Sequence, residues 1–324
     1  MNDKVCLTTF VYGEKYQNYL PMLLYSSCKA NPNYDVILFL YDNLKSEIKN
    51  LIDQLKLTNK LIIFENCFKD CPRINSLKSK CLRWVLWNDI FKEYDYLYTI
   101  DVDMFYIKEP TPLHIQHIQH MQTTGLPFDN MRRICYPQKN CISILRRIKY
   151  AGLRSIRKFI RENNPEYKLT GLHFVDVENY YRIFTHEKRE IVKKKIYNNG
   201  YLESIMTLSD EVLLATMMKK LGFDINNLAI QSNSTSSLSF ENPTRPEFRP
   251  HHGIHMGIFR NNIDTINKNK GDKDILDSET YAYYINIFKN EILPDPNFKL
   301  IIDNCDNNIK DSFKNLFEYY KINK

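Results

Sequence analysis

Short apolar segments alternate with segments of helical periodicity through the first hundred residues, and this alternation constrains the fold more than any other feature. The apolar, β-branched segments cover residues 5–10, 35–41, 61–64 and 96–100. Helical spacing of apolar residues lies between them, over residues 16–28, 48–55 and 77–91. Short strands separated by helices are typical of a mostly parallel sheet that helices cover on both faces. The sequence therefore predicts an α/β fold.

The remainder of the chain is more mixed and ends in helices. Helical periodicity covers residues 113–121, 142–162, 180–195, 210–221 and most of 275–322, and residues 169–177 are typical of a strand. Residues 231–250 are rich in Ser, Asn and Pro, which predicts a long loop. We therefore expect one α/β domain over residues 1–262, with a basic helical insertion at about 130–162, and a helical extension over residues 263–324.

Neither a secretory signal nor a membrane-spanning segment is visible in the sequence. The apolar run at residues 5–11 is too short for a signal peptide, and no run approaches the ~20 residues that cross a bilayer. Eight cysteines are scattered along the chain, and Cys67 and Cys71 lack the second pair that a structural zinc site needs. We expect a cytoplasmic protein with reduced thiols.

The net charge of +7 is concentrated in one segment. Residues 130–161 contain ten Lys or Arg and no Asp or Glu, so the rest of the chain is net acidic. Within this segment, residues 142–162 combine an apolar stripe with a basic face, a pattern typical of helices that lie in an anionic membrane interface. A solvated helix packed on the protein's own core gives the same pattern. We expect an anionic partner, with the inner face of the membrane as one candidate, and no nucleic acid.

Two carboxylates, Asp101 and Asp103, follow the last strand-like segment of the first hundred residues. The backbone turns where a strand ends, so side chains one residue apart are no longer forced to opposite faces. Both carboxylates can then reach one hard cation, and Mg²⁺ or Mn²⁺ is usually held by one or two carboxylates together with substrate phosphates. A solvated acidic turn would give the same letters. Ligands of α/β sheets bind beyond the carboxyl ends of strands, where this pair falls, so the context favours a metal site.

A second polar cluster lies late in the chain. It contains His251, His252, Gly253, His255 and Gly257, followed by Arg260. Imidazole can supplement carboxylates around Mn²⁺, the glycines allow a loop to approach a phosphate closely, and an arginine can bind a phosphate oxygen. The alternative is a polar loop whose imidazoles are hydrogen-bonded to backbone. Three earlier histidines, His114, His117 and His120, are spread too widely on a helix for one small ion, so we expect them at the surface.

Two further features have both a structural and a functional interpretation. Asp210 and Glu211 begin a helical segment after Ser209, where acids stabilise the positive end of the helix. Either acid could instead face a substrate as a base, a nucleophile or a hydroxyl-orienting group. Arg83 lies on the helical segment before the Asp pair, which either exposes it to solvent or directs it toward the metal site.

In this order, the elements resemble glycosyltransferases of the GT-A fold, most closely the family 8-like enzymes, which are retaining and use nucleotide sugars. The matching segments lie within about residues 4–260: the N-terminal strand 7–12, Arg83-Trp84, the aromatic strand and D-x-D of 96–103, Asp210-Glu-Val-Leu-Leu214 and His255-Met-Gly257. Two positions depart from the family pattern. Thr170-Gly-Leu-His173 stands where Asn-Ala-Gly is expected, and Lys-Pro-Trp does not follow the late histidine.

The resemblance implies a role for each matching residue around the metal. Asp101, Asp103 and His255 would bind Mn²⁺ or Mg²⁺, and Asp101 would also touch the ribose. Gly257 and Arg260 would receive the diphosphate of the donor.

The remaining roles concern the base, the sugar and the acceptor. The base pocket would be lined by Thr8, Thr9 and Tyr12. Arg83 would hold the donor sugar, and Asp210 and Glu211 would face the anomeric carbon and the incoming hydroxyl group.

The implied activity is metal-dependent transfer of a hexose from a nucleotide-diphosphate sugar, with a UDP-sugar as the expected donor. The acceptor would be a glycan or a lipid-linked acceptor, as in surface polysaccharide synthesis. If configuration is retained, the donor phosphate can take the acceptor's proton, whereas in an inverting enzyme Asp210 or Glu211 would be the base.

Two alternatives remain. One is a nucleotidyltransferase of similar fold, although such enzymes commonly carry a Gly-rich basic loop that residues 11–16 lack. The other is a catalytically degenerate nucleotide-binding module at a membrane.

Overall fold

The computed structural model describes residues 3–134, 167–198, 210–231, 253–269, 273 and 275–322. Within these residues, a six-stranded sheet has the order β3-β2-β1-β4-β9-β6. Its strands are β1 (Val5–Val11), β2 (Asp35–Leu40), β3 (Leu61–Phe64), β4 (Tyr96–Thr99), β6 (Phe128–Asp129) and β9 (His173–Asp176). β1 is parallel to β2 and β4, and β2 to β3, whereas β9 is antiparallel to β4 and β6. This mixed, mostly parallel sheet confirms the predicted α/β class.

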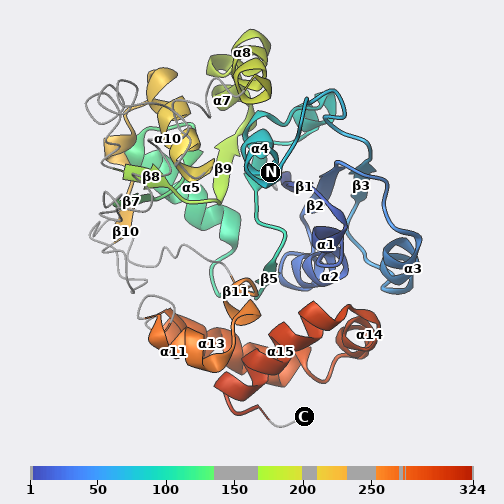
Figure 1. Ribbon diagram of the computed structural model, residues 1–324. Coiled ribbons are helices and arrows are strands. Elements are labelled where there is room, and N and C mark those ends of the chain that lie inside the picture. The colour runs from blue at the N-terminus through green and yellow to red at the C-terminus, as the bar shows by residue number, and fades with distance from the viewer. Residues whose placement is uncertain are drawn as a thin grey trace, which may run out of the picture.

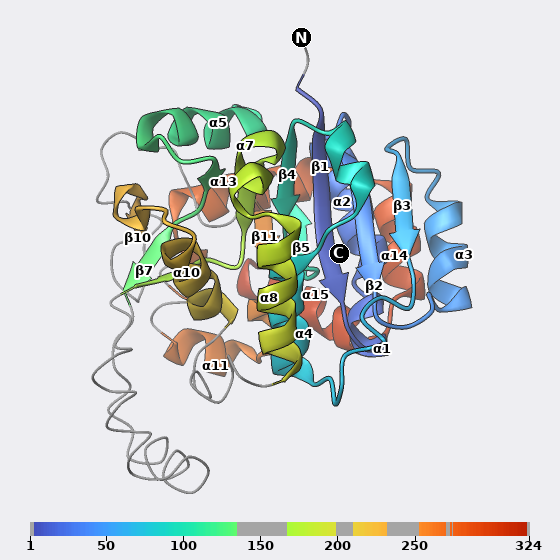
Figure 2. The ribbon, with the colours of Figure 1, turned by 90° about the horizontal axis from the view of Figure 1, so that it is seen from above.

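Helices cover both faces of the sheet (Figures 1 and 2). One face packs against α2 (Leu20–Ala30), α3 (Ser46–Gln54), α5 (Leu113–Thr124) and the C-terminal helices, with the short α1 (Glu14–Gln17) at its edge. The opposite face packs against α4 (Ser76–Leu82), α7 (Val177–Ile183), α8 (His186–Tyr197) and α10 (Asp210–Lys220). Successive residues of β1 alternate between the two cores, as the pleat of a strand requires: Leu7 joins the first core and Cys6 the second.

The C-terminal helices form a layer at the bottom of Figure 1. They are α11 (Ile263–Lys268), α13 (Glu279–Ile287), the π-helical turn Phe288–Ile292, α14 (Pro296–Asn304) and α15 (Asn307–Tyr319). Their aromatic side chains share a core with the sheet. The ring of Phe105 lies 5.5 Å from that of Phe288, 6.0 Å from Phe298 and 6.2 Å from Phe313, centroid to centroid. The helical character predicted for residues 275–322 is thereby confirmed.

Two smaller sheets bring distant segments to the ends of the main strands. β5 (Met104–Tyr106) pairs antiparallel with β11 (Gly253–His255), and the register places His255 opposite Met104. β7 (Arg132–Ile134) lies between β10 (Ile230–Gln231) and β8 (Tyr167–Leu169). Four 3₁₀ turns in the described residues complete the fold: η1 (Arg83–Val85), η2 (Asp89–Glu93), η3 (Ile225–Asn227) and η4 (Ile258–Arg260).

Three predicted elements are interrupted in the structure. The helix expected over residues 77–91 ends at Leu82 and continues only as two 3₁₀ turns, the second of which begins where the Asn88 side chain accepts the Ile90 N–H. The strand expected over 169–177 is divided between β8 and β9. The helix expected over 180–195 is divided where Thr185 caps the start of α8. In the first and third cases, local side-chain hydrogen bonds to backbone compete with a continuous element.

Several predicted features lie outside the described residues. They are the helix at 142–162 with most of the basic segment, Ser209, almost all of the loop at 231–250, His251 and His252. In the part of the chain that is described, no helix is long and apolar enough to cross a membrane. The six cysteines in that part, Cys6, Cys28, Cys67, Cys71, Cys81 and Cys305, are all free thiols.

Candidate active site

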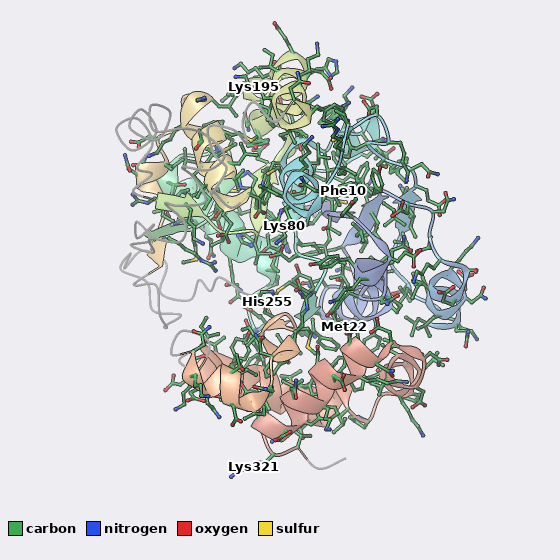
Figure 3. The ribbon with its side chains drawn as sticks, in the orientation of Figure 1. Phe10, Met22, Lys80, Lys195, His255 and Lys321 are labelled. Carbon is green, nitrogen blue, oxygen red and sulfur yellow. The ribbon has the colours of Figure 1, made fainter. Side chains whose placement is uncertain are left out.

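The Asp pair lies where β4 ends, next to the carboxyl end of β1. The Ile100 N–H donates to the carbonyl oxygen of Thr8 at 2.9 Å, and the Thr9 hydroxyl donates to the Ile100 carbonyl at 2.8 Å. These two bonds hold the backbone immediately before Asp101. Asp103 then leads into β5, whose pairing with β11 carries the late segment of the chain to the same place. Figure 3 shows His255 between the C-terminal helical layer and the rest of the molecule.

Asp103 is the centre of one half of the site. Its Oδ2 lies 2.7 Å from a terminal nitrogen of Arg260 and 3.5 Å from Nε2 of His255. Its backbone carbonyl accepts the Met256 N–H at 3.0 Å, which fixes the turn that follows His255. The chain therefore joins two segments about 150 residues apart through one carboxylate.

Arg83 organises the other half. One of its terminal nitrogens contacts Asp101 and the other contacts Asp210, so the guanidinium bridges two carboxylates. The indole N–H of Trp84 donates to the Asp210 carbonyl at 3.1 Å, which ties the start of α10 to η1. The sequence was consistent with Arg83 either at the surface or at the site. The side chain is only 9% exposed and faces the site.

Burial and neighbouring charges set the ionisation of these groups. Burial raises the pKa of Asp101, and the Asp103 carboxylate adds to this although Arg83 opposes it. Burial would also raise the pKa of Asp103, but His255 and Arg260 hold it well below its usual range. The pKa of His255 is raised, since the attraction of Asp103 outweighs the effect of burial. Asp103 is therefore an ionised carboxylate in a partly enclosed setting.

Two glycines allow this close assembly. A Cβ atom at Gly257 would lie 2.7 Å from Oδ2 of Asp103 and 2.9 Å from Nε2 of His255. A Cβ atom at Gly171 would lie 2.9 Å from a terminal nitrogen of Arg83 and 3.0 Å from Oδ2 of Asp101. Any larger residue at either position would take the space beside the functional atoms.

The donor set beside Gly257 fits a hard divalent cation bound with a diphosphate. It offers a carboxylate oxygen and an imidazole nitrogen next to space that a side chain at position 257 would fill. Asp101, the third ligand implied by the resemblance, contacts Arg83. Among the described residues, no group of three or more His, Cys, Asp or Glu side chains is arranged to hold a metal. A cation here would therefore complete its coordination with substrate oxygens, as Mg²⁺ usually does.

The two acids at the start of α10 face different partners. Asp210 contacts Arg83, whereas Glu211 lies 2.6 Å from Nζ of Lys168 and 3.3 Å from a terminal nitrogen of Arg133. The structure thus brings Asp210, and not Glu211, to Arg83 and Asp101.

The three residues expected around the base make different contacts. The Thr9 hydroxyl donates to backbone, and the Thr8 hydroxyl is buried with no hydrogen-bond partner among the described residues. Tyr12 lies at the end of β1, where its ring meets the ring of Tyr41 edge to face at a centroid distance of 5.1 Å. Tyr12 and Tyr41 together offer an aromatic surface at the carboxyl ends of β1 and β2.

Two of the three histidines of α5 are buried, contrary to the surface location expected from the sequence, whereas His114 is half-buried. His117 and His120 are 2% and 1% exposed, and their Nδ1 atoms lie 2.5 Å and 2.6 Å from the two carboxylate oxygens of buried Asp129. Nδ1 of His114 contacts the Tyr34 hydroxyl at 2.6 Å. Helical spacing placed the three histidines together, but it carried no information about Asp129 on β6.

Sequence reasoning missed two residues of the site. Tyr19 accepts a hydrogen bond from Nε of Arg260 at 2.9 Å, and Gly171 lies against Arg83 and Asp101. Tyr19 had a helical spacing that indicated only core packing. Gly171 lies in the segment that departs from the family pattern, which was the one available signal for it.

A cavity of about 960 Å³ lies away from this cluster, at the amino end of β4. Trp87, Tyr96, Tyr181 and Arg189 are among the residues that line it. None of the residues predicted for the metal, the donor or the acceptor lines this cavity.

No protein-family model matches the chain, and no curated protein matches it. Among solved structures, it is similar to the mannosyltransferase Ktr4p from S. cerevisiae, with a TM-score of 0.48, 11% identity and coverage of 87% of this chain and 82% of that chain. It is also similar to the glycosyltransferase GlyE of Streptococcus pneumoniae TIGR4 (TM-score 0.38, 11% identity, 71% and 46% coverage). A third is the galactosyltransferase LgtC in complex with donor and acceptor sugar analogs (TM-score 0.33, 14% identity, 60% and 70% coverage). The likeness is remote at these values.

Proposed function

We propose that this protein is a metal-dependent glycosyltransferase of the GT-A type, which moves a hexose from a nucleotide-diphosphate sugar to a glycan or lipid-linked acceptor. The observation that carries the proposal is the convergence of Arg83, Asp101, Asp103, Asp210, His255 and Arg260 at the carboxyl ends of β1 and β4. We assign the transferase to residues 1–262, with residues 263–324 as a helical extension.

Asp103 and His255 would hold Mn²⁺ or Mg²⁺ at the space beside Gly257. A bound dication supplies positive charge that stabilises the departing diphosphate in the transition state. Asp103 suits this task because its pKa is held low, so it stays ionised. Asp101 contacts Arg83, and it would either contact the ribose of the donor or complete the coordination of the metal ion.

Arg260 and Gly257 would receive the diphosphate. The guanidinium of Arg260 lies 2.7 Å from Asp103, so an anion near this carboxylate also meets a cation of the protein. Gly257 lacks a side chain where phosphate oxygens must approach. The chain has no Lys-Pro-Trp after His255, and Arg260 supplies the cation in that region.

Arg83 and Asp210 would act on the sugar and the acceptor. Their contact leaves a planar guanidinium and a carboxylate fixed together, which suits hydrogen bonding to several hydroxyl groups. We assign the acceptor-side role to Asp210, because Glu211 faces Lys168 and Arg133. Tyr12 and Tyr41 would stack against the base, which we propose to be uracil.

We further propose that the transfer retains configuration, as the resemblance implies. In a retaining reaction, an oxygen of the departing diphosphate takes the acceptor proton on the same face, and Asp210 orients the hydroxyl group. In an inverting reaction, Asp210 would itself remove the proton. NMR of the anomeric proton in the first product distinguishes the two outcomes.

The proposal is tested by calorimetric titration of UDP and GDP with and without Mn²⁺, followed by a screen of nucleotide sugars for slow hydrolysis. We expect Mn²⁺-dependent binding of UDP and release of free sugar from at least one UDP-hexose. Binding without hydrolysis or transfer would favour the degenerate module. Release of pyrophosphate from a nucleoside triphosphate and a sugar phosphate would favour a nucleotidyltransferase.

A further inference from the structure

We infer that the C-terminal helix α15 is part of the donor-binding machinery, because Asn315 fixes the turn that carries Arg260 while Tyr19 fixes the Arg260 side chain. The inference rests on the proposed function, which assigns Arg260 to the diphosphate. It adds two positioning residues, Tyr19 at the N-cap of α2 and Asn315 on α15, which lie outside the D-x-D and late-histidine segments.

Asn315 holds the backbone on both sides of Arg260. Its side-chain amide donates to the carbonyl oxygen of Phe259 at 2.9 Å and to that of Asn261 at 3.0 Å. An amide group has two N–H donors, so both are used on this turn. The contacts cross more than fifty residues of sequence, and they make α15 the support of η4.

The turn needs such support because it is short. η4 spans only Ile258–Arg260, and the bond from the Asn261 N–H to the Ile258 carbonyl is 3.3 Å long. A single 3₁₀ turn has weaker hydrogen-bond geometry than an α-helix, so its own backbone specifies its position poorly. The two bonds from Asn315 therefore fix the position of the Arg260 Cα together with the buried ring of Phe259.

Tyr19 fixes the other end of the same residue. Its hydroxyl oxygen accepts from Nε of Arg260 at 2.9 Å, and the guanidinium lies 4.9 Å from the Tyr19 ring and 5.6 Å from the Tyr16 ring. Tyr19 is itself 1% exposed at the start of α2 and has little freedom to move. One terminal nitrogen of Arg260 remains directed at Asp103.

These contacts hold the Arg260 side chain in one orientation. Its backbone is held by Asn315 of α15, its Nε by Tyr19 and its terminal nitrogen by Asp103. Arginine has a flexible stem, and ordering it beforehand reduces the entropy lost when the diphosphate binds. A displacement of ~1 Å in a positioned group can cost about 10²-fold in rate, so support from α15 has a direct functional value.

The test is a double-mutant cycle read by calorimetric binding of UDP with Mn²⁺ and by donor hydrolysis. Asn315→Ala should weaken UDP binding about tenfold in the full-length protein, and in the Arg260→Ala background it should have little further effect. Coupled residues show such non-additivity, whereas independent ones add. Asn304→Ala is the matched control, because Asn304 is exposed and its side-chain amide donates within its own helix, to the Leu300 carbonyl.

Tyr19→Phe provides a second variant that keeps the buried ring and removes only the hydroxyl group. It should reproduce the loss of affinity and show the same coupling to Arg260→Ala. Equal losses in both backgrounds would show that Asn315 and Tyr19 act independently of Arg260, which overturns the inference but leaves the proposed function intact. Failure of the unmodified protein to bind any nucleoside diphosphate with Mn²⁺ would instead overturn the proposed function.

Discussion

The Asp103 carboxylate interacts with two basic side chains, because Arg260 and His255 both lie within 3.5 Å of its Oδ2. Asp103→Ala should lower transfer by at least ~10³-fold, since a bound dication contributes several kcal/mol of transition-state stabilisation. The variant should stay folded by circular dichroism. Removal of divalent ions with EDTA should have the same effect on the unmodified protein, and full activity in EDTA would refute the proposed metal dependence.

His173 is a buried neutral imidazole on β9, and it makes the fold sensitive to acid. Its pKa is lowered to about 3 by burial, its Nε2 has no hydrogen-bond partner in the described residues, and its ring lies 5.0 Å from that of Phe128. Below pH ~6.5, the His173 imidazole is protonated in the unfolded chain but stays neutral in the folded chain. The free energy of unfolding should therefore fall by ~1.4 kcal/mol per pH unit from pH ~6.5 toward pH 3.

His173→Phe should remove this dependence, since a phenyl ring suits the aromatic surroundings. Urea unfolding at pH 7 and pH 5 should show a smaller difference for the variant than for the unmodified protein. His186→Gln, at an exposed position, is the control and should leave the difference unchanged. Equal acid sensitivity in His173→Phe would mean that other groups dominate.

At the scale of elements, the N-terminus of α10 separates two acids that are adjacent in sequence. Asp210 contacts Arg83, and Glu211 contacts Lys168 and Arg133. Asp210→Asn should lower kcat on the order of 10²-fold with UDP affinity nearly kept, as expected when an orienting or acid–base group is lost. Glu211→Gln should change kcat little and should affect stability through its two ion pairs. The reverse ranking in steady-state kinetics would move the acceptor-side role to Glu211.

The strands were the most predictable elements, and the reasons are local. After Asp35, β2 is a continuous apolar run, as burial on both faces of a parallel sheet requires, and β3 is a short apolar run that is half-buried at the edge of the sheet. The interruptions at residues 83–88 and 170–172 were not predictable, because they depend on contacts between distant residues. Arg83 meets Asp101 and Asp210, and Asn130 donates to the carbonyl groups of Thr170 and Leu172.

The same distinction applies to the site. The sequence indicated which side chains could serve a metal and a diphosphate, since Asp103, His255 and Arg260 have the necessary chemistry. It did not indicate that Arg260 would meet Tyr19 and Asp103 together, or that Asp101 would face Arg83. These pairings follow from the register of β5 with β11 and from the packing of α2, neither of which has a local signature.

At the scale of the whole molecule, residues 130–161 contain ten Lys or Arg and no Asp or Glu, and we propose that this charge attracts an anionic acceptor or membrane surface. If the acceptor is lipid-linked, the protein should bind vesicles with anionic lipid at low salt and dissociate as salt rises, because the attraction is screened. Flotation with neutral vesicles is the control. Replacing Arg154, Lys158 and Arg161 together by Gln should reduce binding, and absence of binding at low salt would favour a solvated helix.

The aromatic core shared by β5 and the C-terminal helices has a consequence for how the protein can be divided. Phe105 lies two residues after Asp103, and its ring packs among Phe288, Phe298 and Phe313. A chain cut at residue 262 would expose that ring to water beside the Asp103 carboxylate. If the C-terminal helices are exchanged for those of another protein, β5 must therefore be exchanged with them. We expect β5 and the C-terminal helices to change together in evolution and in engineered variants.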